Sequence, residues 1–296
     1  MGVRNKTGGA VYDLIAKHGK RNILFYMERK CTALHLSRLS KVSGPNLMKV
    51  YSIVNQKGGV AKTSTAQALS AGLKRRRKKV LVIDLDPSCN FTSTAGVMDA
   101  EPNIYDVLNG EATIVDCIKH TSFGDIVPGS NDLAGADRIL KDYGSDRKLA
   151  EAFEPIKNDY DYVVIDTPPM LGVLSVNALV ASDGIVVPAN ADIYSLDGID
   201  ELSRTIAAVK RYGNPNLKVE GILITQDFPR TILSRDCKSV AKEIASEMGT
   251  KVFKTAIRYN VSVKEAQAKM KTVFEYGPND NAAVDYNAWI TELLKN

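Results

Sequence analysis

From residue 49 onward, short runs of apolar, β-branched residues alternate with longer segments of helical periodicity. The apolar runs are near-continuous, which is typical of strands that are buried on both faces of a sheet. This alternation predicts an α/β fold: a mostly parallel, twisted sheet with helices on both faces and a functional site at the carboxyl ends of its strands. The predicted strands are residues 50–55, 80–84, 124–127, 162–166, 184–188, 221–225 and 251–255, and helical patterns between them include 63–76, 195–212 and 233–248.

Residues 1–47 have a different pattern and form a predicted helical extension to a second unit, residues 48–296. The extension contains amphipathic helical stretches, and its apolar positions near the end are spaced like the core of a helix-turn-helix. Two interpretations remain open, a DNA-binding helix-turn-helix and a helical cap that packs on the remaining chain or on a second subunit. The core positions in question are Leu36, Leu39, Val42 and Leu47, and Ser43 and Pro45 suit the start of the second helix.

Charge is distributed unevenly along the 296 residues. The net charge is +5, and residues 1–48 hold nine Lys/Arg against two acidic residues, a net of +7, so the remainder carries 5 − 7 = −2. A basic arm on a near-neutral body indicates contact with a polyanion, although a solubilising tail has the same composition. A second basic run at residues 74–79 is either a phosphate-contacting patch or the solvated end of a helix.

Composition narrows the class of protein further. Hydrophobic residues make up 44% and charged residues 25% of the chain, which is typical of a globular protein. No apolar run reaches the roughly 18–20 residues of a membrane span, and Lys17, Lys20 and Arg21 interrupt any signal peptide. We therefore expect a cytoplasmic protein without a membrane partner. The four cysteines are widely spaced, which argues against disulfides, zinc and paired cluster ligands.

A phosphate-binding loop is predicted at residues 57–64, Lys-Gly-Gly-Val-Ala-Lys-Thr-Ser, because it follows a strand and opens a helix. Gly58 and Gly59 permit a tight turn close to the phosphates. Successive amides, including those of Val60 and Ala61, then form an anion nest at the positive end of the helix dipole. A plain glycine turn before a helix would not require the Lys-Thr pair that follows.

The side chains of this loop suit ATP or ADP with Mg²⁺. Lys62 is expected to reach the β- and γ-phosphates, the Thr63 hydroxyl to ligate Mg²⁺, and Ser64 to contact an α-phosphate oxygen. Lys57 lies too far back to duplicate Lys62 on the same nucleotide. We therefore expect Lys57 to reach a nucleotide held by another subunit, where it neutralises charge during phosphoryl transfer.

Three aspartates end two of the predicted strands. Asp84 and Asp86 close one strand and point to the same side, toward the phosphate loop. We expect Asp86 to position the attacking water and Asp84 to support it or the metal shell. Asp166 closes another strand and is expected to hold Mg²⁺ through water. Aspartates that merely cap turns are common, so the argument depends on all three motifs occurring in this order.

Together these motifs resemble the ParA/Soj partition ATPases, within the P-loop family that also includes MinD. The resemblance covers about residues 48–296. It implies an ATPase that forms a nucleotide-sandwich homodimer, binds DNA non-specifically on the nucleoid and is stimulated by a ParB-type centromere-binding partner. It also implies that Lys57 reaches across the dimer, that Asp86 activates water and that Pro188 lies at the nucleotide.

The sequence departs from the family pattern at several positions. Ala61 replaces a usual glycine, and Ser88-Cys89 replaces Gln-Gly after Asp-Pro. A DNA-contacting arginine of the shorter ParA proteins falls on Ser262. Basic residues that would substitute for it are Arg258, Lys264, Lys269 and Lys271.

Two other functions remain as alternatives. A MinD-like positioning ATPase would need a basic amphipathic membrane helix after the last domain helix, and none is visible before Asn296. A nucleotide-gated DNA-binding regulator of its own operon would keep the phosphate loop and dispense with Asp86, so the presence of Asp86 favours hydrolysis.

Overall fold

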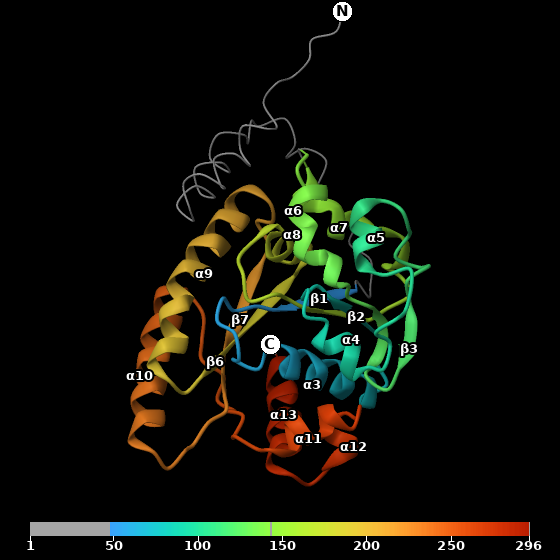
Figure 1. The fold of residues 1–296 in the computed structure, drawn as a ribbon. Helices are drawn as coiled ribbons and strands as arrows, with labels where there is room; N and C mark the ends of the chain where they lie inside the picture. The colour runs from blue at the N-terminus through green and yellow to red at the C-terminus, as the bar shows by residue number, and fades with distance from the viewer. Residues whose placement is uncertain (1–47, 143, 296) are drawn as a thin grey trace, which may run out of the picture.

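The computed structural model describes residues 48–142 and 144–295. The predicted extension at 1–47, with its helix-turn-helix, lies outside the described residues. The described chain forms a seven-stranded sheet with the strand order β3-β4-β2-β5-β1-β6-β7 (Figure 1). All neighbouring pairs are parallel except β3 and β4, which are antiparallel. This confirms the predicted mostly parallel sheet.

Six of the predicted strands are confirmed, with small shifts at their ends. The observed strands are β1 (Lys49–Ile53), β2 (Val80–Asp84), β3 (Lys119–Thr121), β4 (Gly124–Val127), β5 (Tyr162–Asp166), β6 (Gly184–Asn190) and β7 (Lys218–Thr225). The predicted strand at 251–255 is wrong. That segment runs beside β7 and pairs with it through one isolated bridge, Ile222 with Val252, so no continuous ladder forms. A second isolated bridge, Asp227 with Arg258, lies beyond the ends of both segments.

Helices cover both faces of the sheet, as predicted. One face carries α3 (Lys62–Arg75) and α13 (Asn281–Leu293), with α4 (Asn90–Thr94), α11 (Ser262–Ala268) and α12 (Val273–Tyr276) beside them (Figure 1). The other face carries α8 (Val173–Ala181), α9 (Ile193–Tyr212) and α10 (Ile232–Glu247), together with short helices. These are α5 (Ile104–Asn109), α6 (Ala136–Ile139), α7 (Lys148–Ala152) and the 3₁₀ turns Asn131–Gly135, Ser145–Arg147 and Glu154–Ile156.

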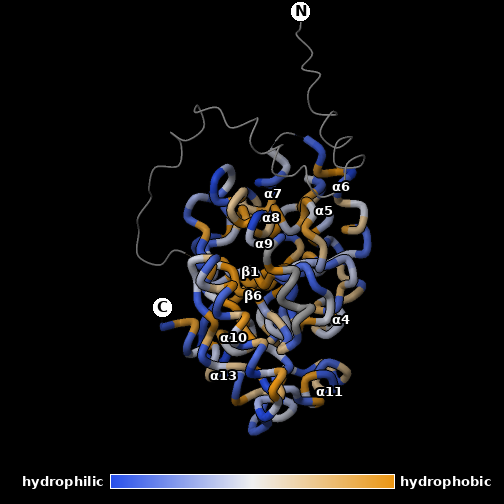
Figure 2. Tube along the Cα trace, turned by 90° about the vertical axis from the view of Figure 1, so that its left-hand side faces the viewer, coloured by the Kyte–Doolittle hydropathy of each residue, from blue (hydrophilic) through white to orange (hydrophobic). Residues whose placement is uncertain are grey.

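Alternate residues of the central strands point into two hydrophobic cores, one on each face of the sheet, because successive side chains of a strand point to opposite faces. Tyr51 and Ile53 of β1 pack with α3 and α13, whereas Val50 packs on the opposite face. In Figure 2 the hydrophobic trace is concentrated around β1 and β6 in the middle of the molecule. Among the described residues, no helix combines the length and the apolarity that crossing a membrane would require.

Candidate nucleotide-binding site

The phosphate loop joins the carboxyl end of β1 to the amino end of α3. Two of its residues have left-handed backbone conformations, Gly59 with φ 77° and Ala61 with φ 63°. Ala61 is the N-cap residue of α3, and no side chain among the described residues caps that helix end. The first amides of α3 are therefore available to an anion, in the direction favoured by the helix dipole.

Side chains from neighbouring strands hold this loop in place. Asn55 donates to the carbonyl oxygen of Pro188 at 2.7 Å, and its own side-chain oxygen accepts the Lys57 amide at 3.0 Å. Pro188 is thus a buried strand residue behind the loop, which it supports through Asn55. Further along, Gln226 Nε2 donates to the Gly59 carbonyl at 2.7 Å. These anchors preorganise the loop before any ligand binds.

Lys62 is directed into the loop. Its side chain is buried, and Nζ donates to the Lys57 carbonyl oxygen at 3.0 Å. Burial lowers the pKa of this ammonium, while the carboxylates of Asp166 and Asp86 act in the opposite direction. A desolvated cation interacts strongly with an arriving phosphate, because the local dielectric constant is low.

Lys57 is the first residue of the loop and is more exposed than Lys62. Its Nζ lies 2.9 Å from Asp192 Oδ1, just beyond the end of β6, and both side chains are about one-third exposed. Lys57 therefore lies at the surface beside the phosphate loop, whereas Lys62 is enclosed by it.

Asp84 and Asp166 are register partners at the carboxyl ends of adjacent strands. Both are fully buried. Burial raises the pKa of Asp84 to about 6, although hydrogen bonds from Thr92 act to lower it. Burial and the charge of Asp84 also raise the pKa of Asp166 well above its usual range. Two buried like charges side by side favour protonation unless a cation neutralises them.

The two carboxylates differ in their surroundings. Asp84 Oδ2 accepts from the Thr92 amide at 2.9 Å and the Thr92 hydroxyl at 2.6 Å, and Oδ1 accepts from the Asp86 amide at 3.2 Å. Neither oxygen of Asp166 has a hydrogen-bond partner of standard geometry among the described residues. The Thr63 hydroxyl is nevertheless close enough to lower the Asp166 pKa. Asp84 therefore holds the segment that follows β2 in place, whereas the oxygens of Asp166 remain available as metal ligands.

Asp86 lies at the start of that loop and is almost fully buried. Its Oδ1 accepts from the Ser88 amide at 2.9 Å, and the next helix, α4, begins with Cys89 as a left-handed N-cap residue. The turn fixes the position of the carboxylate, and Asp86 is near enough to Lys62 to act on its pKa.

The structure thus brings most of the predicted site residues to one edge of the sheet. The loop residues Gly58 to Ser64, with Asp84, Asp86 and Asp166, gather where β1, β2 and β5 end. Ser64 also accepts a hydrogen bond from Gln267 of α11 at 3.0 Å, which links the loop helix to the C-terminal region. The sequence reasoning missed Asn55, Asp192 and Gln226. Each is a polar residue within two positions of the end of a strand, and that position is the signal that could have pointed to them.

The basic residues of the C-terminal region differ from one another in exposure and in ion pairing. Arg258 forms a bidentate pair with Asp285, with its Nε at 2.8 Å from Oδ2 and its Nη2 at 2.6 Å from Oδ1. Ser262 is buried. Three lysines of this region remain exposed, namely Lys264, Lys269 and Lys271. Arg258 therefore holds α13 in place, and Ser262 does not reach the surface.

Comparisons with known proteins identify the family of this chain. Residues 48–219 match a family described as AAA domain. The sporulation initiation inhibitor protein Soj of Bacillus subtilis is 38% identical over 253 residues, which cover 84% of this chain and 99% of that protein. The chromosome-partitioning ATPase Soj of Thermus thermophilus is 39% identical over 243 residues, which cover 82% and 94%.

Solved structures give the same fold. A structure described as cobyrinic acid a,c-diamide synthase from Mycobacterium smegmatis, with bound ADP and magnesium, has 30% identity and a TM-score of 0.73, covering 84% of this chain and 94% of that one. The septum site-determining protein MinD of Pyrococcus horikoshii, complexed with Mg-ADP, has 25% identity and a TM-score of 0.68, covering 83% and 96%. On the extent and identity of these matches, the chain belongs to the ParA/Soj family of partition ATPases.

Proposed function

We propose that this protein hydrolyses ATP in a Mg²⁺-dependent nucleotide-sandwich homodimer that binds DNA non-specifically and drives DNA segregation. A ParB-type centromere-binding partner would stimulate hydrolysis, and the protein would act on the nucleoid. The observation that carries the proposal is the convergence of Lys62, Asp86 and Asp166 at an uncapped helix N-terminus. The named relatives support the partition role, because Soj of Thermus thermophilus is a chromosome-partitioning ATPase.

Nucleotide binding and ATP hydrolysis are carried out by different residues in this proposal. Lys62 and the first amides of α3 hold the phosphates. Asp86 orients a water whose oxygen attacks the γ-phosphorus, while the bond to the β–γ bridging oxygen breaks and its electron pair leaves with ADP. Asp86 accepts the hydrogen bond of that water, and its turn with Ser88 limits its freedom. Such preorganisation matters most in the transition state.

The residues present fit a magnesium ion. Asp166 has two buried oxygens without ordinary hydrogen-bond partners among the described residues, and Thr63 supplies a hydroxyl beside it. No group of three or more His, Cys, Asp or Glu in the described part of the chain forms a ready metal cage. This suits Mg²⁺, which keeps waters and takes phosphate oxygens as ligands. When bound, the ion would neutralise charge on the phosphates.

Lys57 is proposed to act in trans. Its ammonium lies at the surface beside the loop and is paired with Asp192. A second protomer facing the same edge would present its phosphates to this ammonium. The proposal then requires the lysine to leave Asp192 when the dimer forms.

The MinD-like alternative has less support. The apolar face of α13 packs against α3 and the sheet through Tyr286, Trp289 and Ile290, so α13 itself is not available as an amphipathic membrane helix. The regulator alternative differs in lacking hydrolysis, so turnover separates it from a partition ATPase.

The deciding experiment is light scattering of the full chain with ATP and Mg²⁺, with and without random-sequence duplex DNA. We expect the Asp86→Ala variant to form a stable dimer and to bind DNA, and the Lys62→Ala variant to remain monomeric because it does not hold nucleotide. Wild-type nucleotide affinity in Lys62→Ala, or a monomer at saturating ATP in both wild type and Asp86→Ala, would overturn the proposal.

A further inference from the structure

Six consecutive cations, Lys74 to Lys79, end α3 and lead into β2 at the amino edge of the sheet. This edge is opposite the nucleotide site. Lys74 and Arg75 belong to the last turn of α3, where cations stabilise the helix dipole by roughly 0.3–1 kcal/mol. The dipole effect falls off beyond that turn, so it does not account for the exposed side chains of Arg77, Lys78 and Lys79.

Part of the run has a structural role. Arg76 donates to the Gly72 carbonyl, to Asn287 and to Thr291, which ties α3 to α13. Arg75 lies over the Phe274 ring, with its guanidinium 4.9 Å from the ring centroid. Lys74 donates to the Thr121 carbonyl oxygen of β3. Among the described residues, the side chains of Arg77, Lys78 and Lys79 have no such contact to explain their position.

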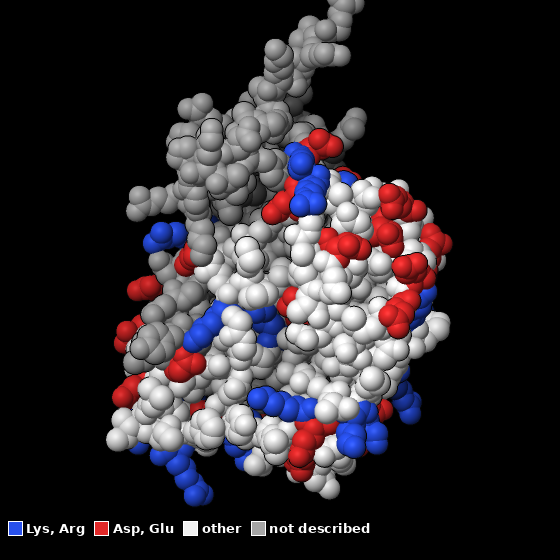
Figure 3. Space-filling model, viewed as in Figure 1, with Lys and Arg blue, Asp and Glu red and all other residues white. Residues whose placement is uncertain are grey.

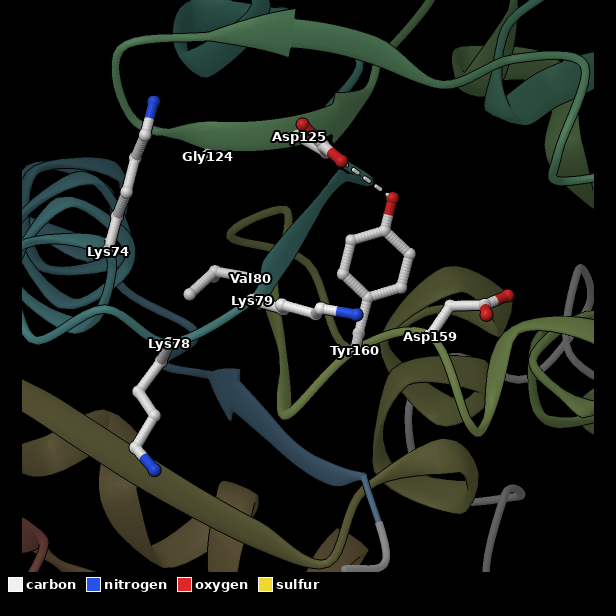
Figure 4. A pocket seen from close by; sticks show the side chains of 8 residues that line it. All are labelled: Lys74, Lys78, Lys79, Val80, Gly124, Asp125, Asp159 and Tyr160. Carbon is white, nitrogen blue, oxygen red and sulfur yellow. Dashed lines mark hydrogen bonds between the residues drawn. The ribbon is translucent and has the colours of Figure 1, made fainter.

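Lys74, Lys78 and Lys79 line a hollow of about 370 Å³ between α3 and the starts of β2, β4 and β5. The other lining residues are Val80, Gly124, Asp125, Asp159 and Tyr160. Figure 4 shows Lys74 extending along one side toward the β3–β4 hairpin and Lys79 extending toward Tyr160 on the other. The ammonium groups of Lys74 and Lys79 therefore border the hollow from different directions, whereas the Lys78 side chain extends away from Asp125 and Tyr160.

The three lysines of the hollow outnumber its two acidic residues, Asp125 and Asp159. Both oxygens of Asp125 are engaged, one with His120 Nδ1 at 2.7 Å and the other with the Tyr160 hydroxyl at 2.8 Å. Asp159 stands at the rim. Figure 3 shows Lys and Arg side chains at the lower right, over α3 and α12, whereas acidic side chains gather higher, over α5 and β3. On a body whose net charge is −2, this is a local concentration of positive charge.

We propose that this α3-end patch, centred on Lys78 and Lys79, binds the sugar–phosphate backbone of DNA, with one phosphate in the hollow. The inference rests on the proposed DNA-binding function and assigns its surface. DNA fits better than a membrane, because none of the exposed large apolar side chains of the described residues lines the hollow. It also accounts for DNA binding by a chain whose Ser262 is buried and whose Arg258 is committed to Asp285.

The position of the patch leaves the nucleotide edge open. α3 runs from the phosphate loop to the patch over 14 residues, about 20 Å. DNA at one end and a second protomer at the other would therefore not compete for the same surface.

The test compares double variants of the full chain in the ATP form by fluorescence anisotropy with a random-sequence duplex at several salt concentrations. Lys78→Gln/Lys79→Gln should reduce the log–log salt slope by about 1.8, since each phosphate contact contributes about 0.9. Affinity at 0.15 M salt should fall roughly 10- to 30-fold. Lys78→Arg/Lys79→Arg should keep the wild-type slope.

A matched control removes the same charge elsewhere. Lys210 and Arg211 are exposed in the last turn of α9, and Lys210→Gln/Arg211→Gln should leave slope and affinity unchanged. An unchanged slope in Lys78→Gln/Lys79→Gln, or a slope lost only in Lys269→Gln/Lys271→Gln, would overturn the assignment. A wild-type protein that fails to bind DNA would instead refute the proposed function.

Discussion

Lys57 Nζ and Asp192 Oδ1 of the same chain lie 2.9 Å apart, one in the phosphate loop and the other two residues beyond the end of β6. This pair ties the lysine expected to act across the dimer to its own protomer. Because both side chains are about one-third exposed, the pair contributes only about 0.2–1 kcal/mol. That range is small enough for a nucleotide on a second subunit to displace Asp192.

Replacing Asp192 should therefore ease dimerisation. In Asp192→Asn, Lys57 has one competitor fewer, so the ATP-dependent dimer should form at about two- to fivefold lower protein concentration. Analytical ultracentrifugation with ATP and Mg²⁺ measures this directly. Asp236→Asn, which removes an exposed carboxylate on α10, is the control and should behave as wild type. A weaker dimer in Asp192→Asn would mean that Asp192 acts across the interface instead.

Asp86 should separate binding from turnover. Asp86→Ala removes the carboxylate that is expected to orient water, and such an interaction is made mainly in the transition state. We expect single-turnover hydrolysis to fall about 100-fold or more while ATP affinity stays within a few-fold of wild type. Rapid quench with radiolabelled ATP gives the rate, and equilibrium binding gives the affinity. Hydrolysis at the wild-type rate would remove Asp86 from this role.

We expect Asp166 to lower the stability of the ligand-free protein and to be needed for magnesium binding. Asp166→Asn removes one of two adjacent buried carboxylates, so at pH 7.5 without nucleotide or Mg²⁺ the variant should melt at least about 3 °C above wild type, roughly 1 kcal/mol. Mg·ATP should raise the melting temperature of wild type much more than that of the variant. Equal stabilisation of both proteins by Mg·ATP would argue against Asp166 as a metal-holding residue.

The difference in melting temperature between Asp166→Asn and wild type should depend on pH, and the raised pKa of Asp84 is one reason. Its pKa of about 6 in the folded chain lies above the ordinary 3.8, so the folded chain binds a proton that the unfolded chain has lost. That contribution to stability is present below about pH 4 and is lost as the pH rises through 6. The Asp166 pKa is raised well above its usual range by burial and by the charge of Asp84, so Asp166 also takes up a proton in wild type as the pH falls, whereas Asp166→Asn has already lost that charge. The difference in melting temperature between Asp166→Asn and wild type should therefore become smaller from pH 7.5 to pH 5.

The fold was largely predictable because buried parallel strands carry continuous apolar runs, and those of β2 and β5 end in aspartates. β3 was missed because Lys-His-Thr has no apolar signature. The segment at 251–255 has strand-like residues but meets β7 only at a single bridge, and sequence pattern does not encode the partner of an edge segment.

The phosphate loop was predictable for a different reason, since its chemistry requires particular residues at fixed spacing. Its supports were not predictable in this way. Asn55 and Gln226 follow strands, where polar residues usually serve turns. The packing of β6 beside β1 gives Asn55 its partner Pro188, and the position of β7 beside β6 brings Gln226 to the loop. The same applies to Asp192, which is 135 residues from Lys57 in the chain.

Two departures from the family pattern coincide with left-handed backbone. Ala61 has φ 63° and Cys89 has φ 52°, and each is the N-cap residue of a helix at the site. Both replace glycines of the ParA/Soj pattern, and glycine adopts this conformation without the penalty of about 1–2 kcal/mol that a Cβ brings. The sequence could flag both substitutions, but only the backbone explains why glycine is usual there.

Restoring glycine at position 61 should stabilise the protein. Glycine removes about 1–2 kcal/mol of backbone strain at this left-handed position, and it costs about 0.5–1 kcal/mol through added backbone entropy in the unfolded chain. The free energy of unfolding of Ala61→Gly should therefore rise by about 0.5–1 kcal/mol, which corresponds to roughly 1–4 °C in melting temperature. Ala268→Gly makes the same change in α11 and should lose a similar amount. Cys89→Gly should gain less than Ala61→Gly, because the Cys89 side chain is buried and its removal forfeits apolar burial. A melting temperature of Ala61→Gly below that of wild type would show that Ala61 carries no such strain.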